Sequence, residues 1–258
     1  MPGRFTRHGA TGSEVAGDAP FRSTARTHVG KVRSVNEDRL VERPDAGFWA
    51  IADGMGGHRA GDVAAEMVAN ALQGCIEHGP VTAEAVESAV QRVNDALVQN
   101  SQERRDQISG STLVALLARG EHLQCLWVGD SRAYLYRAGQ CRKISRDHSV
   151  VQELVDVGIV PAADARHHPQ AHVLTRAIGV SELLRLDTLG YRIEPGDILL
   201  LCSDGLSDLL DQSQMEDCLA GDGIDNKADA LLDAALAGGA PDNITLILIE
   251  VLASHGER

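Results

Sequence analysis

Four aspartates occupy the same kind of position in the 258-residue sequence, where a short apolar segment meets a tight turn. The segments are typical of buried strands and the turns contain Gly, Ser or Asn; the aspartates are Asp53, Asp130, Asp204 and Asp242. Carboxylates gathered at strand ends repel one another unless they bind hard cations, and Mg²⁺ and Mn²⁺ prefer such oxygen ligands. A turn dipeptide explains any one of them alone, but the four together predict a metal site.

The rest of the pattern predicts a chain that mixes strands and helices. The predicted strands are 48–52, 112–118, 122–128, 133–136, 187–193, 197–202 and 244–252; the predicted helices are 62–77, 82–99 and 150–157, with two more after Gly205. Because the three strands between 112 and 136 follow one another closely, we expect an antiparallel meander. The first two helices are expected to form an antiparallel pair.

One large domain is expected, flanked by short tails. Residues 1–22 are rich in Gly, Arg, Thr and Ala without apolar periodicity, and they predict a flexible tail. The domain is expected over 23–252, followed by a C-terminal tail at 253–258. Within it, 147–179 breaks the regular pattern and predicts a mobile surface subdomain.

Charge and cysteine content exclude several classes of protein. A formal net charge of −13 disfavours nucleic acid and anionic membranes as partners, since these require clustered Lys and Arg. The sequence contains no run of 18 or more apolar residues, which a helix needs to span a bilayer. The five cysteines are scattered without a C-x-x-C pair, which favours a reducing, cytoplasmic location. None begins the C-x5-R spacing of a thiolate phosphatase, so a cysteine nucleophile is disfavoured and core positions are expected.

Six short motifs, in order and at characteristic spacing, identify a resemblance over about residues 23–252. They are Gly30-Lys31-Val32-Arg33 with Asn36-Glu37-Asp38, Ala52-Asp53-Gly54-Met55-Gly56-Gly57-His58, Ser109-Gly110-Ser111-Thr112, Val128-Gly129-Asp130-Ser131-Arg132, Ser203-Asp204-Gly205-Leu206 and Pro241-Asp242-Asn243-Ile244-Thr245. The chain resembles a bacterial member of the PP2C (PPM) family of protein phosphatases. Each motif alone is a weak signal, whereas six together are specific.

The resemblance implies an α+β fold, an α-β-β-α sandwich of two mainly antiparallel sheets covered by helix pairs. It also implies that 147–179 is a small flap subdomain beside the site. Asp53 would bridge two Mn²⁺ or Mg²⁺ ions, the carbonyl of Gly54 would bind one of them, and Asp204 and Asp242 would bind the other. Asp130 would help to hold a third, weaker ion.

Three further residues match functional positions of the family. Arg33 matches a phosphate-binding arginine, and its planar guanidinium suits a phosphoryl group; a surface salt bridge with Glu37 or Asp38 is the alternative. Glu37 and Asp38 match positions that orient metal-bound waters, although solvated turn charges would also explain them.

The histidines leave the general acid unassigned. Many eukaryotic relatives have His directly after the Asp-Gly pair, where this chain has Met55; His58 and a metal-bound water are the alternatives. A zinc site at His167, His168 and His172 is disfavoured, because no cysteine or carboxylate nearby in the sequence completes a tetrahedral set.

The predicted function is hydrolysis of phosphoserine and phosphothreonine in proteins by water activated between two metal ions, without a phosphoenzyme. The expected partners are phosphoproteins, including a Ser/Thr kinase that the enzyme opposes, and the protein is expected to be a monomer. A catalytically silent module on the same fold should have lost one of the three main aspartates. A hydrolase of small phosphoesters would use the same site.

Overall fold

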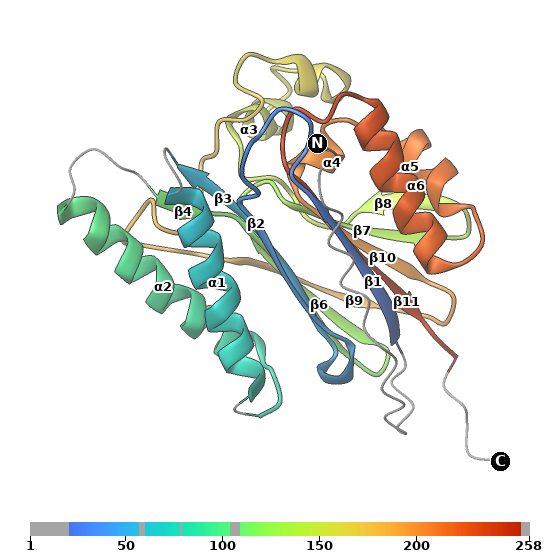
Figure 1. Cartoon of the computed structure of the whole chain (residues 1–258), viewed down its shortest axis with the longest axis horizontal. Coiled ribbons are helices and arrows are strands. Elements are labelled where there is room, and N and C mark those ends of the chain that lie inside the picture. The colour runs from blue at the N-terminus through green and yellow to red at the C-terminus, as the bar shows by residue number, and fades with distance from the viewer. Residues whose placement is uncertain (1–20, 57–59, 78, 104–108, 254–258) are drawn as a thin grey trace.

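The computed structural model describes residues 21–56, 60–77, 79–103 and 109–253, and these form two packed antiparallel sheets between outer helices (Figure 1). One sheet has the order β1-β11-β10-β7-β8: Phe21–His28, Ile244–Val251, Ile198–Cys202, Arg132–Arg137 and Gln140–Lys143. The other has the order β2-β3-β5-β6-β9: Asp38–Arg43, Phe48–Gly56, Leu113–Arg119, His122–Val128 and Asp187–Arg192. A short strand, β4 (Ser109–Ser111), also pairs with β3.

Helices cover the outer face of each sheet, as Figure 1 shows. On the second sheet lie α1 (Ala60–Glu77) and α2 (Ala83–Glu103); on the first lie α4 (Asp204–Ser207), α5 (Gln212–Leu219) and α6 (Ile224–Ala237). The remaining short elements are η1 (Pro44–Ala46), α3 (Val150–Asp156) and η2 (Ala162–His167). The predicted α-β-β-α sandwich and the α1–α2 pair are therefore confirmed.

The central strands are almost wholly apolar because both of their faces are buried. All five residues of β10 are buried, as are the first six of β11. Successive side chains point to opposite faces, so Trp49, Leu199 and Ile247 pack between the sheets while Leu200 and Leu248 pack under α5 and α6. At the edge of this inter-sheet core, Phe21 meets Trp49 edge-to-face, with ring centroids 5.3 Å apart. The core thus has three layers, one between the sheets and one under the helices on each side, and this packing holds the strand ends in place.

The predicted meander is wrong at its third strand. The strands β5 and β6 pair with each other, but β7 belongs to the other sheet and pairs with β10 and β8. The chain changes sheet at Gly129, whose φ of +103° favours glycine and where a Cβ would press against Thr112. The turn that carries Asp130 is thus a connection between the sheets.

Element boundaries differ from the predicted ones at the end of β3 and at the first strand. The strand β3 continues through Asp53 to Gly56, since its last residues pair with β4. The first strand begins at Phe21, two residues before the expected start of the domain, because it pairs along its whole length with β11. Residues 1–20 and 254–258 lie outside the described residues. In the described part of the chain, no helix is both long and apolar enough to cross a membrane.

Candidate metal centre

Carboxylates from both sheets meet in one cavity of about 440 Å³. Asp53 lies in β3, Asp204 begins α4 directly after β10, and Asp242 precedes β11. Because β10 and β11 are antiparallel neighbours, the end of one and the start of the other lie at the same edge of the sheet. Of the predicted site residues, the cavity is lined by Arg33, Glu37, Asp53, Gly54, Asp130, Asp204 and Asp242.

The mutual repulsion of these carboxylates is large because they are withdrawn from bulk water. Burial raises the pKa of Asp53 well above its usual value, and the negative charges of Asp38 and Asp204 raise it further. Burial likewise raises the pKa of Asp204, with added repulsion from Asp130. Such a cluster is stabilised by cations, and oxygen ligands of this kind fit Mg²⁺ or Mn²⁺.

Asp38 lies behind the cavity, opposite Asp53 in the β2–β3 pairing. Ser203 Oγ donates a hydrogen bond of 2.9 Å to Asp38 Oδ2, whereas Asp38 Oδ1 is buried with no hydrogen-bond partner among the described residues. Burial raises its pKa to about 6. A buried oxygen left in this state is available to a metal-bound water, so the residues present fit a metal site.

The glycines after Asp53 and Asp204 allow close approach of neighbouring backbone. A Cβ at Gly54 would overlap the carbonyl oxygen of Gly61, and one at Gly205 would overlap that of Asn243. The Asp53-Gly54 pair therefore packs against the start of α1, and the Asp204-Gly205 pair packs against the residue that follows Asp242. The sequence showed Gly205 only as a turn residue, whereas for Gly54 the family resemblance implied a backbone carbonyl that binds metal.

Arg33 contacts a predicted metal ligand. Its Nη2 lies 2.7 Å from Asp242 Oδ2. The alternative considered from sequence, a salt bridge with Glu37 or Asp38, is not the pair that forms among the described residues. Hydrogen bonding to Asp242 raises the pKa of Arg33, so its guanidinium is charged. The side chain is half-exposed and lines the cavity.

Asn243 organises the loops that carry this part of the site, a role that sequence reasoning missed. Its Oδ1 accepts a hydrogen bond of 2.8 Å from the backbone N–H of Glu37. Its Nδ2 donates to the carbonyls of Val29 and Val35, each at 2.9 Å. One buried amide thus holds the Glu37 loop against Asp242. The available signal was its position beside Asp242.

His148 similarly holds the loop that carries Asp130. The backbone N–H of Gly129 donates to His148 Nδ1 at 3.1 Å, and the backbone N–H of His148 donates to the Gly129 carbonyl at 2.9 Å. The ring stacks on Trp127, with centroids 6.3 Å apart. Burial raises the pKa of Asp130 to about 6. The sequence placed His148 only in the flap.

The fold brings carboxylates to one of the three histidines that were considered as zinc ligands. His172 Nδ1 lies 3.2 Å from Asp208 Oδ2, and His172, Asp204 and Asp208 can place one ligand atom each within 4.8 Å of the others. Folding thus supplies His172 with two carboxylates that lie far from it in the sequence, and the exclusion of zinc from these histidines stays a prediction. His172 also lines the cavity. His58, the other histidine considered as a general acid, lies outside the described residues.

The cysteines take no part in the site. All five are free, and none lines the carboxylate cavity. Burial raises the pKa of Cys125 and Cys202 far above the usual range and that of Cys141 to about 11. These three thiols are buried and stay protonated, as predicted for core residues. Cys75 and Cys218 are only partly buried, so the core prediction is wrong for them.

Asn94 anchors the flap segment that borders the cavity. It is fully buried in α2; its Oδ1 accepts from the backbone N–H of Gly179 at 2.8 Å, and its Nδ2 donates to the carbonyl of Ser181 at 2.9 Å. We expect Asn94→Ala to lower the free energy of unfolding by about 1–3 kcal/mol, since the buried N–H of Gly179 and the partly buried carbonyl of Ser181 lose their partner. Urea denaturation measures this.

Asn226→Ala is the matched control for that substitution, since the Asn226 amide donates to a carbonyl at an exposed site. It is expected to change the free energy of unfolding by less than about 0.5 kcal/mol. Equal effects of the two substitutions would contradict the anchoring role of Asn94.

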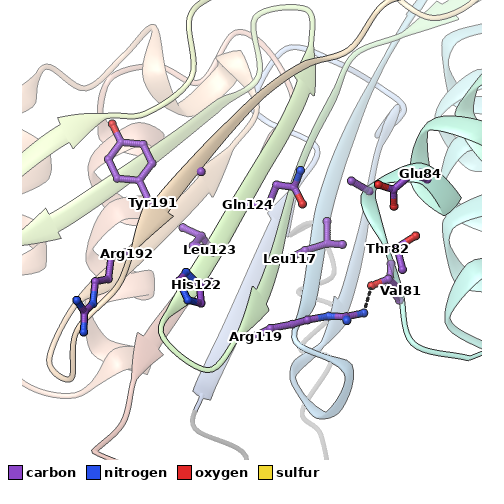
Figure 2. Close-up of a pocket in the computed structure, with 12 residues that line it drawn as sticks. Val81, Thr82, Glu84, Leu117, Arg119, His122, Leu123, Gln124, Tyr191 and Arg192 are labelled. Atoms are coloured by element: carbon purple, nitrogen blue, oxygen red, sulfur yellow. Dashed lines mark hydrogen bonds between the residues drawn. The ribbon is translucent and has the colours of Figure 1, made fainter.

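A larger cavity of about 630 Å³ lies at the other end of β5 and β6 (Figure 2). It is lined by the start of α2 and by residues such as Arg119, His122 and Arg192. Arg119 is directed across it to the carbonyl of Val81, at 2.7 Å. None of the predicted site residues lines this cavity. The carboxylates gather in the smaller one.

Known proteins resemble the chain over most of its length. A protein-family model described as Protein phosphatase 2C matches residues 18–154. The serine/threonine phosphatase stp of Listeria welshimeri is 37% identical, over 87% of this chain and 94% of the relative. PppA of Pseudomonas aeruginosa, described as a key regulatory component of T6SS, is 41% identical with a TM-score of 0.82, covering 90% of this chain and 98% of that one.

A third similar protein was solved with metal. The catalytic domain of the serine/threonine protein phosphatase PstP, in complex with two manganese ions, is 34% identical with a TM-score of 0.81. The alignment covers 90% of this chain and 99% of the other. The similarity in sequence and the similarity in fold therefore point to the same group of proteins.

Proposed function

The chain belongs to the protein phosphatase 2C family, and we propose that its own strand-end carboxylates hold the divalent ions with which it dephosphorylates proteins. It is a metal-dependent serine/threonine phosphatase that acts on phosphoproteins. The observation that carries the assignment of residues is the convergence of Asp53, Asp204 and Asp242 on one cavity. Three mutually repelling, partly buried carboxylates at strand ends form a rigid cation site.

Within this site we assign the ligands as follows. Asp53 would help to hold both of two divalent ions, the Gly54 carbonyl would hold one of them, and Asp204 and Asp242 would hold the other. Asp130 would help to hold a third ion. When bound, two divalent ions activate a water for in-line attack on phosphorus and neutralise charge on the phosphoryl oxygens.

The surrounding side chains hold these ligands and the water in place. Asp38 lies opposite Asp53 with one buried oxygen available to accept a hydrogen bond. Glu37 borders the cavity, and Asn243 holds its backbone. We propose that Glu37 and Asp38 orient metal-bound water, since outer carboxylates of this kind fix the position of what the metal binds.

Arg33 is proposed to bind the phosphoryl group of the substrate. We expect Arg33→Lys to raise KM for a phosphothreonine peptide about tenfold, because an ammonium group cannot make the two parallel hydrogen bonds of a guanidinium. Steady-state kinetics with Mn²⁺ measures this change.

Arg142→Lys, at an exposed position of β8, is the matched control and should leave KM unaltered. An unchanged KM in Arg33→Lys would remove Arg33 from the substrate site.

Two other functions were considered. A silent binding module would lack a ligand carboxylate, but Asp53, Asp204 and Asp242 are all present. A hydrolase of small phosphoesters would use the same carboxylates, and comparing kcat/KM over a panel of phosphopeptides and small esters distinguishes it from a protein phosphatase.

We further propose that the physiological partner is a Ser/Thr kinase whose products the enzyme dephosphorylates. The five free cysteines support a reducing, cytoplasmic setting.

The direct test is phosphate release from a phosphothreonine peptide with Mn²⁺, with Mg²⁺ and with a chelator. We expect turnover with either ion and none with the chelator. No turnover by the folded, metal-loaded protein would favour the binding module. Equal turnover in the chelator would contradict the metal mechanism.

A further inference from the structure

Part of the lining of the catalytic cavity is apolar and has no part in the chemistry described above. It is formed by Met55, Leu174, Ala177 and Val180, which we call the apolar wall; they line the same cavity as the carboxylates. Val180 exposes half of its surface to solvent. Exposed apolar surface beside a few convergent polar groups is characteristic of a site that binds an apolar part of a ligand.

The residues of the apolar wall come from two segments of the chain, which approach each other beside Gly110. A Cβ at Gly110 would lie 2.7 Å from Met55 Cε and 2.8 Å from the carbonyl oxygen of Ile178. Met55 and the segment 174–180 therefore meet over this glycine. Ser111 and Ile178 exchange backbone hydrogen bonds of 3.1 and 2.9 Å, which joins the segment to the end of β4.

The apolar wall is also held in place and carries a compensated charge. Asn94 anchors Gly179, and the backbone N–H of Thr175 donates to the carbonyl of His148 at 2.8 Å. The Arg176 guanidinium within this segment lies 2.7 Å from Asp187 Oδ1. A surface that is already ordered loses little conformational entropy when a ligand binds.

We propose that the apolar wall binds the apolar side chain of a residue next to the phosphoserine or phosphothreonine of the substrate. This proposal rests on the proposed function, since it places the phosphoryl group at the carboxylates of the same cavity. The neighbouring side chain is then within the cavity and covers Val180 and Leu174, removing apolar surface of both partners from water. The enzyme selects phosphoprotein segments with such a neighbour.

The test compares two blocked phosphothreonine peptides that differ only in the residues flanking phosphothreonine, Leu in one and Asn in the other. Leu and Asn have similar shapes, so the comparison isolates hydrophobicity. We expect kcat/KM of the wild type to favour the Leu peptide about tenfold, the discrimination typical of an apolar contact. Val180→Thr should reduce this ratio, and Val180→Asp should abolish it.

Val157→Asp is the control, because Val157 is exposed on the flap and does not line the cavity. It should keep the wild-type ratio. A wild-type ratio near one, or a ratio that Val180→Asp leaves unchanged, would overturn the proposal.

A third substrate, N-acetyl-phosphothreonine methylamide, has no neighbouring side chain. It distinguishes failure of the apolar-wall proposal from failure of the proposed function. If it is hydrolysed with Mn²⁺ while the peptide ratio is near one, the apolar-wall proposal alone fails. If none of the three substrates is hydrolysed, the proposed function fails and the apolar-wall proposal fails with it.

Discussion

Asp204→Asn is expected to lower kcat/KM for a phosphothreonine peptide by more than about a hundredfold, since loss of an outer hydrogen-bond partner of a metal ligand already costs about 10–100-fold. The amide keeps the shape of the carboxylate but lacks its negative charge, so it binds a hard cation poorly. Phosphate release at several Mn²⁺ concentrations measures the effect. Added Mn²⁺ should restore only part of the activity.

The same substitution should leave the metal-free protein folded. Asp204 is surrounded by Asp38, Asp130 and Asp242, and a neutral amide removes part of this repulsion. The melting temperature without metal should therefore equal or exceed that of the wild type. Asp233→Asn, at an exposed position of α6, serves as the control. Full activity in Asp204→Asn would contradict the assignment of this ligand.

Gly205→Ala is expected to be the most damaging of the small substitutions. The added methyl group would overlap the backbone carbonyl of Asn243, and backbone cannot move aside as a flexible side chain can. We expect the free energy of unfolding to fall by about 1–3 kcal/mol or more, as in overpacked cores. Because Asn243 also holds the Glu37 loop, Mn²⁺ affinity should fall as well. Denaturant unfolding and metal titration measure the two effects.

Gly221→Ala is the matched control for Gly205→Ala, since a methyl group there would meet its nearest neighbour at 3.8 Å, an ordinary contact. It should change stability and metal affinity little. Equal effects of Gly205→Ala and this control would contradict the close packing of Gly205 against the carbonyl of Asn243.

The central strands were predictable because a strand that is buried on both faces requires a run of apolar residues. The aspartates were predictable because they follow or precede such runs. The runs in β3, β6, β10 and β11 are of this kind, and Asp53, Asp204 and Asp242 lie at the end of three of them. In contrast, β1 was missed because only Phe21 among its residues is buried. That strand depends on its pairing with β11, and an edge strand of this type gives little local signal.

Contacts between distant parts of the chain could not be predicted from local patterns. The change of sheet after Gly129, the pairing of Arg33 with Asp242 and the approach of His172 to Asp208 all depend on the packing of the layers. The layer order itself came from the family resemblance, since strand and helix periodicity fit several architectures. Local sequence thus predicted the candidate aspartates, and tertiary packing determined their neighbours.

The most direct test of the central claim is anomalous diffraction at the manganese absorption edge from crystals grown with Mn²⁺. We expect two strong peaks within bonding distance of Asp53, one of them also bound by Asp204 and Asp242. Peaks only at other carboxylates, or none in this cavity, would contradict the assignment of these residues as the metal centre.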